Sequence, residues 1–210
     1  MPLLPPVDHL VWAGRDLERE IDRLETLTGV RAAVGGRHPG EGTRNALIGI
    51  GPSMYLELIA PDPDQEPPPH PRWFGLDILD APRLMTWAAR CDHIDGMAAR
   101  ARAAGIGLGA VRQGRRELSG GEVISWRLTY PDPRLGSGVI PFFIDWGDSR
   151  HPSRSAPGGI GLVDLRAEHP DPAGVSSLLG RLGLELRIAH GPAPALIATL
   201  DTPRGLVELR

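Results

Sequence analysis

The sequence has 210 residues, of which 41% are hydrophobic and 23% charged, and its formal net charge is −3. These values are typical of one or two globular domains and exclude a disordered, collagen-like or coiled-coil chain. All 23 basic residues are arginine, which excludes Schiff-base lysine chemistry and the lysine of a P-loop. Cys91 is the sole cysteine, so an internal disulfide framework is excluded as well.

The sequence contains no apolar run of the roughly 18 residues that a membrane span needs, and residues 1–7 are too few and too proline-rich for a signal peptide. It also lacks a long basic stripe that could bind a phosphate backbone. We therefore expect a cytoplasmic protein whose partner is a small molecule, with no nucleic-acid or membrane partner.

The first part of the chain predicts a strand followed by a helix. Residues 7–12 are β-branched and aromatic, as in a strand. Asp16 is in a good helix-cap position and Gly29 is suited to end the helix. One apolar stripe along this helix is formed by Leu17, Ile21, Leu24 and Leu27. The glycine-rich run 34–42 is expected to be a turn or loop, and strands are expected at 43–50 and 54–60.

The same order of elements then returns twice. The second copy has a short apolar run at 84–89, a helix with Ile94, Met97, Ala98 and Ala101 that ends near Gly105, and strands at 108–111, 123–129 and 139–146. The third has a strand at 161–165, a helix with Val175, Leu178, Leu179 and Leu182 that ends at Gly183, and strands at 184–189, 195–200 and 206–209.

These repeats predict an α+β fold of three βαβββ units with curved mixed sheets that form a cleft. We assign the modules 1–62 and 84–147 to one domain, 1–147, and expect the third unit, 158–210, to pack on it. A single helix leaves one face of each sheet open, so two units can pair around a cleft suited to a small molecule.

The connectors 61–71 and 147–159 are rich in proline, glycine, serine or acidic residues and are expected to be exposed linkers. An odd number of units leaves one sheet face uncovered. A homodimer, or another part of the same chain, would cover that face.

Two side chains of the first unit are chemically distinctive. His9 lies on the first expected strand and Glu57 on the last, within Tyr55-Leu56-Glu57-Leu58-Ile59-Ala60-Pro61. Alternation places Tyr55, Glu57 and Ile59 on one face of that strand, which is either exposed or turned into the cleft. Taken alone, each of the two residues is more often structural than functional.

The segment Asp8-His9-Leu10-Val11-Trp12, the helix after it and the segment 55–61 resemble the first module of the vicinal oxygen chelate superfamily. With Gly35-Gly36-Arg37-His38-Pro39-Gly40 and Gly42-Thr43-Arg44-Asn45-Ala46-Leu47, the chain is similar to the glyoxalase-like branch. The resemblance is most specific over 7–62, weaker over 84–147 and only architectural over 158–210.

This resemblance implies paired βαβββ modules whose first and last strands supply ligands to a divalent metal ion, and the ion holds two vicinal oxygens of the substrate. It places His9 and Glu57 on the two ligand positions of the first module, with Zn, Ni, Mn or Fe as the ion. Such an ion acts as a Lewis acid on a carbonyl and stabilises an enediolate, while the carboxylate of Glu57 moves the proton.

The later units depart from the ligand pattern. Counting back from the helix start of the second unit places Thr86 where a histidine or glutamine is expected, and its closing strand offers Asp145 or Phe143, depending on register. The third unit offers Asp164 and Glu208. If units one and two pair, the metal has two firm ligands and a doubtful one. If units one and three pair, it has four ligands. The alternative is that metal binding has been lost.

The glycine-rich run around His38 is a second candidate site, because its backbone N–H groups can turn outward and hold an anion. Thr43 and Asn45 lie on the same face of the expected strand 43–50. Arg127 and Ser125 lie on the same face of the expected strand 123–129. We predict that the substrate is bound by His38, Thr43, Arg44, Asn45 and Arg127. The alternative is a flexible hairpin with solvated arginines.

Other polar and aromatic side chains are expected to be structural or exposed. Arg115 and Arg116 precede a turn and are expected mainly at the surface, with carboxylate binding as the alternative. Core positions are expected for Trp12, Trp87, Trp126 and Trp146, and exposed loop positions for His70, His151, His169 and His190.

Together these features predict a divalent-metal-dependent lyase or isomerase that acts on a small carbonyl or carboxylate compound. Ring-cleaving dioxygenation is less well supported, because it usually needs two histidines and a carboxylate. The alternative is a metal-free protein that binds and sequesters a small molecule on the same fold. A purely structural domain would require the absence of a deep cleft.

Overall fold

A computed structural model describes residues 4–117, 121, 123–130 and 136–210. The first unit comprises β1 (Val7–Ala13), α1 (Leu17–Thr28), β2 (Ala33–His38), β3 (Thr43–Gly51) and β4 (Met54–Pro61). The carboxylate of Asp16 accepts a hydrogen bond from the backbone N–H of Arg19, and Gly29 ends α1 with a φ of 79°. Both ends of this helix are therefore as the sequence predicts.

The second and third units each include short 3-10 segments besides their helix and strands. The second comprises η1 (Trp73–Ile78), β5 (Arg83–Arg90), α2 (Ile94–Ala103), β6 (Val111–Glu117), β7 (Val123–Thr129), η2 (Gly136–Gly138) and β8 (Phe142–Asp145). The third comprises η3 (Pro152–Arg154), β9 (Gly161–His169), α3 (Pro172–Arg181), β10 (Arg187–His190), β11 (Ala195–Thr202) and β12 (Gly205–Leu209). None of the helices in the described part of the chain is long and apolar enough to cross a membrane.

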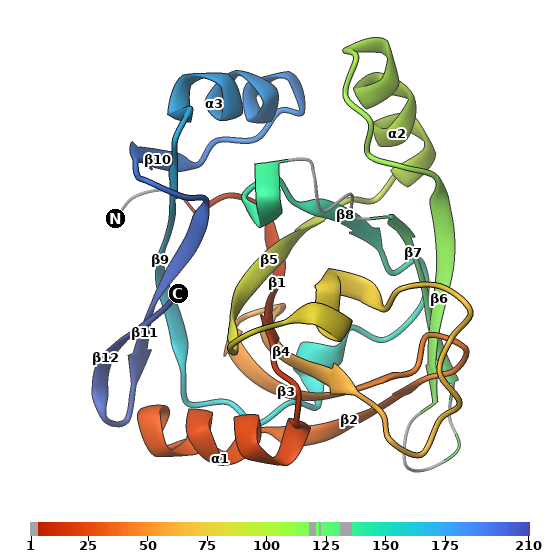
Figure 1. Ribbon diagram of the computed structural model, residues 1–210, viewed down its shortest axis with the longest axis vertical. Coiled ribbons are helices and arrows are strands. Elements are labelled where there is room, and N and C mark those ends of the chain that lie inside the picture. The colour runs from red at the N-terminus through yellow and green to blue at the C-terminus, as the bar shows by residue number, and fades with distance from the viewer. Residues whose placement is uncertain (1–3, 118–120, 122, 131–135) are drawn as a thin grey trace.

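Units one and two close into one barrel with the strand order β1-β4-β3-β2-β6-β7-β8-β5 (Figure 1). β1 pairs in parallel with β4 and antiparallel with β5, so the two units meet along their first strands. On the opposite side, β2 meets β6 at the pair Arg37 and Glu117. The two units therefore surround one shared interior.

The third unit forms a separate sheet with the order β10-β9-β11-β12, beside the barrel (Figure 1). The backbone N–H of Leu84 in β5 donates to the carbonyl of Arg210, and the side chain of Arg204 donates to the carbonyl of Thr26 in α1. β9 pairs in parallel with β10, the strand directly after its helix, whereas β1 pairs with β4. The third unit thus repeats the element order of the first but not its strand order.

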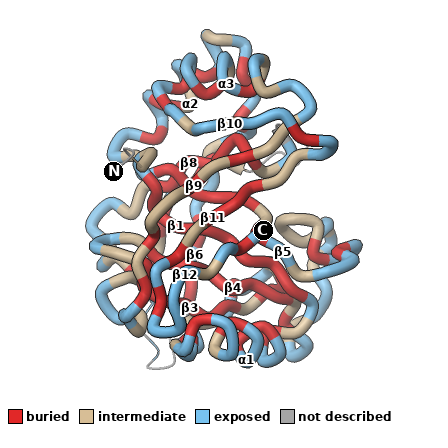
Figure 2. Tube along the Cα trace, turned by 90° about the vertical axis from the view of Figure 1, so that its left-hand side faces the viewer, coloured by how far each residue is buried: buried red, intermediate tan, exposed pale blue. Residues whose placement is uncertain are grey.

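Alternation along the barrel strands separates two apolar cores. Leu10, Leu56 and Trp87 point outward and pack with α1, α2 and the third unit. Val11, Ile59 and Phe142 point into the barrel. Figure 2 shows that the buried residues follow the strands, while the outer faces of the helices are exposed. The inward face of the strands is therefore the surface on which a site can form.

Some boundaries differ from those expected. Residues 33–38 form β2 and only 39–42 form a turn, because pairing with β3 stabilises a glycine-rich strand that its own propensity disfavours. The strand expected at 108–111 begins at Val111 and continues to Glu117, where the polar sequence gave no strand signal. The strand expected at 139–146 is limited to 142–145.

Candidate functional site

The candidate site is a small cavity of about 30 Å³ at the centre of the barrel. Its polar wall consists of His9, His38, Asn45, Glu57 and Arg116. Its aromatic wall consists of Tyr55, Trp73, Phe74, Trp126, Phe142 and Trp146. A space of this size holds about one water molecule, and the polar side chains around it are buried.

The register of β1 and β4 brings His9 and Glu57 together. Val11 lies opposite Glu57 and His9 opposite Tyr55 in this parallel pair, so the inward side chains of the two strands lie diagonally beside each other. Nε2 of His9 is 3.7 Å from Oε2 of Glu57, and both side chains are buried. The imidazole also stacks on the ring of Tyr55, with 4.5 Å between the ring centroids.

A break in the ladder between β1 and β5 places Asp8 beside His9. The register shifts between Val7 and His9, which is the pattern of a β-bulge and lets adjacent side chains lie on one side of a strand. Oδ1 of Asp8 is 2.8 Å from Nδ1 of His9. Trp146 donates to the same carboxylate at 3.2 Å, and Nε2 of His151 lies 3.2 Å from Oδ2.

Asp8 fixes the tautomer of His9. Burial raises the pKa of the Asp8 carboxyl, but the hydrogen bonds to His151 and His9 outweigh burial and hold the pKa well below its usual range. An ionised carboxylate can only accept hydrogen bonds, so Nδ1 of His9 carries the proton. Nε2 of His9 consequently faces Glu57.

Glu57 is held from its other side by a buried amide and a buried guanidinium. Asn45 donates from Nδ2 to Oε1 of Glu57 at 2.6 Å, and Arg116 donates from Nη1 to Oδ1 of Asn45 at 3.2 Å. Burial lowers the pKa of the Arg116 guanidinium, and the carboxylate of Glu57 acts in the opposite direction. A buried positive charge therefore lies one side chain away from the carboxylate.

His38 completes the polar wall. Its Nδ1 is 2.9 Å from the hydroxyl of Thr43, and its Nε2 is 4.0 Å from Oε1 of Glu57. Burial lowers the pKa of His38 to about 4, against the opposing attraction of Glu57. The imidazole is therefore neutral at pH 7.

Two buried donors in this wall lack an acceptor among the described residues. They are Nε of Arg116 and Nε1 of Trp73, and both residues line the cavity. Leaving a buried donor unsatisfied costs about 1–3 kcal/mol. A ligand that brings an oxygen acceptor, such as a carbonyl or a carboxylate, would satisfy these donors.

Four of the predicted site residues line one cavity, and a fifth contacts it. His9, His38, Asn45 and Glu57 line it, and Thr43 reaches it through its hydrogen bond to His38. Arg44 points to the other face of β3, where it pairs with Glu18 at 2.7 Å.

Arg127 lies outside the cavity, against the expectation that it enters the cleft. Its guanidinium forms two hydrogen bonds of 2.7 Å to the carboxylate of Asp95 in α2. The alternation of side chains in the sequence does not show which face of β7 turns into the barrel. In the structure, the face that carries Trp126 turns inward.

Sequence reasoning missed three residues that support the site. Arg116 was expected mainly at the surface, with carboxylate binding as the alternative, but it is 4% exposed. His151 was expected in an exposed loop but contacts buried Asp8. Asp8 itself carried no separate signal. The glycine-rich run could have indicated a close approach of other side chains to the backbone. A Cβ on Gly35 would lie 2.3 Å from Oδ1 of Asn45 and 2.9 Å from Nη1 of Arg116.

The second unit offers no matching ligand pair among its described residues. The inward positions of β5 and β8 are occupied by Thr86, Ala88, Phe142 and Ile144. Asp145 is partly exposed and accepts a hydrogen bond from the backbone N–H of Gly147, while Phe143 packs outside the barrel. Thr86 and apolar side chains therefore stand where the resemblance expects imidazole and carboxylate.

The third unit also provides no ligand to the barrel centre. Asp164 lies 2.6 Å from Arg187, and Glu208 lies 2.5 Å from Arg166, all within the separate sheet. The expectation of four ligands from units one and three is therefore wrong, because unit one pairs with unit two.

The described residues do not fit the metal site of a paired-module protein. His9 and Glu57 are suitable donors, and an imidazole backed by a carboxylate is common around metals. However, Oε1 of Glu57 already accepts from Asn45, and the buried charge of Arg116 opposes a second cation. No group of three or more His, Cys, Asp or Glu suited to a metal occurs in the ranges that the structure describes.

Comparisons with known proteins identify the fold. A family model described as "Glyoxalase-like domain" matches residues 7–183. A crystal structure of a hypothetical protein from Staphylococcus aureus is 14% identical, with a TM-score of 0.68 over 98% of each chain. Methylmalonyl-CoA epimerase from Mycobacterium tuberculosis is 22% identical over 69% of this chain and 92% of that one, with a TM-score of 0.44. No curated protein matches the chain.

Proposed function

The chain belongs to the glyoxalase-like domain family, and on this basis we propose that it is an acid–base enzyme for a small carbonyl or carboxylate compound. The reaction is of the isomerase or lyase type and takes place at the centre of the barrel. The observation that carries the proposal is the facing pair of His9 and Glu57, with Asp8 behind the imidazole.

The pair can move a proton at carbon. The carboxylate of Glu57 removes a proton from the carbon next to the substrate carbonyl, and the electron pair of that C–H bond forms a C=C bond as the carbonyl oxygen becomes an oxyanion. Nε2 of His9 has a free lone pair because Asp8 holds the proton on Nδ1, so it accepts the proton from the Glu57 carboxyl and exchanges it with water. A proton returns by the same route to the carbon as the C=C bond collapses back to the carbonyl. Positioned acids and bases of this kind contribute about 10²–10⁴ in rate.

The unpartnered donors supply the charge stabilisation that this reaction needs. Arg116 and Trp73 line the cavity, and Nε of Arg116 and Nε1 of Trp73 lack acceptors among the described residues. Donors fixed in a site without bulk water stabilise an oxyanion more than donors in water do. A substrate carbonyl or carboxylate held by them would lie beside Glu57.

Two alternative functions share this site and differ in one requirement each. A metal-free binding protein would use Arg116 and Trp73 without any proton transfer. A metal-dependent lyase or isomerase would need Zn, Ni, Mn or Fe on His9 and Glu57, with the remaining ligands supplied by solvent or substrate.

Hydrogen exchange at carbon tests the proposal. Chelator-treated protein is mixed with 2-oxobutanoate in D₂O, and loss of the C3 proton signal is followed by NMR. We expect catalysed exchange in the wild type, a fall of about 100-fold in Glu57→Gln and His9→Gln, and no change in Glu185→Gln, whose side chain is exposed in the third unit.

The other outcomes are equally informative. Exchange that requires an added divalent ion would overturn the metal-free mechanism. Tight binding of 2-oxobutanoate without exchange would overturn the enzyme and leave the binding protein.

A further inference from the structure

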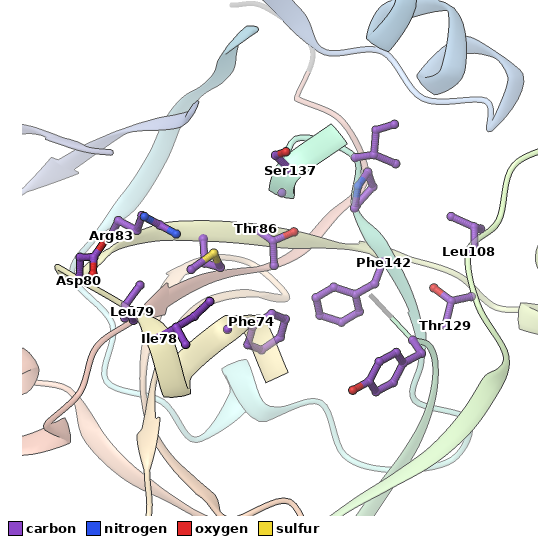
Figure 3. Close-up of a pocket in the computed structure, with 16 residues that line it drawn as sticks. Phe74, Ile78, Leu79, Asp80, Arg83, Thr86, Leu108, Thr129, Ser137 and Phe142 are labelled. Atoms are coloured by element: carbon purple, nitrogen blue, oxygen red, sulfur yellow. The ribbon is translucent and has the colours of Figure 1, made fainter. Parts of the chain in front are cut away.

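A second, larger cavity lies beside the polar centre. It has a volume of about 420 Å³, which is within the range of small-molecule pockets. Figure 3 shows it between η1, β5 and β8, with Phe74, Leu79, Leu108 and Phe142 pointing into it. We call this space the apolar chamber.

The chemistry of the chamber is that of a hydrocarbon pocket. Met85 and Ile140 add to the apolar wall, and its uncharged polar side chains are those of Thr86, Thr129, Tyr130 and Ser137. Charged side chains occur only at one end, where exposed Asp80 and Arg83 lie (Figure 3). Such a lining favours an apolar ligand over an ionic one.

One aromatic pair separates the chamber from the polar centre. Phe74 and Phe142 line both cavities, and their ring centroids are 6.0 Å apart. Phe142 also contacts the imidazole of His9, with 5.5 Å between ring centroids. A molecule that passed between these two rings would reach the proton-transfer pair directly from the chamber.

The backbone at Phe74 adopts an unfavourable conformation. Phe74 has a φ of 58° and Gly75 a φ of 65°, and the left-handed region is unfavourable for an aromatic residue. The central cavity of about 30 Å³ is too small for an organic head group unless a wall residue shifts. Rotation of Phe74 would join the two spaces into one.

We propose that the substrate is an amphipathic carboxylic acid whose oxygenated head binds at Arg116 and Trp73, beside His9 and Glu57, and whose unbranched apolar tail occupies the apolar chamber. This inference rests on the proposed function and names its substrate class. The tail contributes binding by leaving water, and Phe74 is the side chain that moves to admit it.

A chain-length series tests the inference. Binding of pyruvate, 2-oxobutanoate, 2-oxohexanoate and 2-oxooctanoate is measured calorimetrically. We expect the affinity of the wild type to rise about fourfold for each added methylene group, as for transfer of a methylene out of water. An affinity that does not change with chain length would overturn the inference.

Variants that fill the chamber provide the second readout. Met85→Trp and Leu108→Trp, made separately, are expected to abolish the gain from 2-oxohexanoate to 2-oxooctanoate while the affinity for pyruvate stays within about twofold. Val34→Trp is the matched control, because Val34 is exposed on β2, outside the residues that line the chamber, and the series should then match that of the wild type. If the affinity rises from 2-oxohexanoate to 2-oxooctanoate in both Met85→Trp and Leu108→Trp as it does in the wild type, the tail binds elsewhere and the inference is overturned.

The two proposals fail differently. If short and long acids bind equally, exchange at C3 is retained and the chamber proposal alone is wrong. If no acid of the series binds, or none undergoes exchange at C3, the proposed function is wrong, and the absence of any binding refutes the chamber proposal as well.

Discussion

Nε2 of His9 lies 3.7 Å from Oε2 of Glu57, on two parallel strands that the chain joins only after a helix and two further strands. Both side chains are buried, and the nitrogen that faces the carboxylate is the one that Asp8 does not contact. Two groups that can carry a proton therefore share one small, largely buried space.

The tautomer of His9 is predicted to depend on Asp8. Asp8→Asn keeps the size of the side chain but no longer forces the proton onto Nδ1, so Nε2 loses its fixed role. We expect exchange at C3 of 2-oxobutanoate to fall about 100-fold, with binding affinity within about threefold. NMR exchange and calorimetry measure the two quantities, and Asp201→Asn, at an exposed position of β11, is the control. Equal rates in wild type and Asp8→Asn would contradict this role.

Recognition of the carboxylate or carbonyl is predicted to depend on Arg116 and not on its neighbour. Arg116→Met removes the buried charge and the unpartnered Nε donor, and we expect the affinity for 2-oxobutanoate to fall about tenfold or more. Arg115→Met makes the same change on the exposed face of β6 and should leave the affinity within about twofold. Calorimetric titration compares them, and equal losses would show that the arginines act only through overall charge.

Gly35 is predicted to be required for the geometry of the site. In Gly35→Ala, the new methyl group would collide with Asn45 and Arg116 at 2.3 and 2.9 Å. We expect a loss of about 1–3 kcal/mol in the free energy of unfolding, together with weaker binding of 2-oxobutanoate. Gly107→Ala meets nothing within 4 Å and serves as the control in urea unfolding. Unchanged stability and affinity in Gly35→Ala would disprove the close approach.

His38 is predicted to make the fold sensitive to acid. Its pKa is about 4 in the folded protein and near 6.5 in the unfolded chain, so the unfolded chain binds more protons between these values and stability falls as the pH drops. We expect His38 to contribute a loss of about 3 kcal/mol between pH 7 and pH 4. Urea unfolding across this range should show a shallower dependence in His38→Gln. If the free energy of unfolding falls with pH equally in the wild type and in His38→Gln, groups other than His38 cause the acid sensitivity.

Much of the fold could be predicted because its signals are local. Asp16, Gly29 and the stripe of leucines define α1 without reference to the rest of the chain, and the alternation in 55–61 correctly places Tyr55, Glu57 and Ile59 on one face. β2 and β6 were missed or misplaced, because glycine and arginine form strands there only through pairing with neighbours.

The site could be predicted only in part, for the same reason. His9 and Glu57 lie on strands that are easily recognised, whereas the inward direction of Arg116 and the outward direction of Arg127 depend on how the barrel closes. The contribution of Asp8 depends on a bulge, which no alternation pattern reveals. The unit pairing that leaves Thr86 and Ile144 in place of ligands is likewise set by strand order.

Calorimetric titration of the chelator-treated protein tests the central claim most directly. The protein is titrated with 2-oxobutanoate, first alone and then after addition of Mn²⁺ or Zn²⁺. Binding of the acid without any ion, unchanged by the ion and weakened in Arg116→Met, is the result that we predict. Stoichiometric uptake of the ion, with binding of the acid only afterwards, would contradict the account and restore a metal centre on His9 and Glu57.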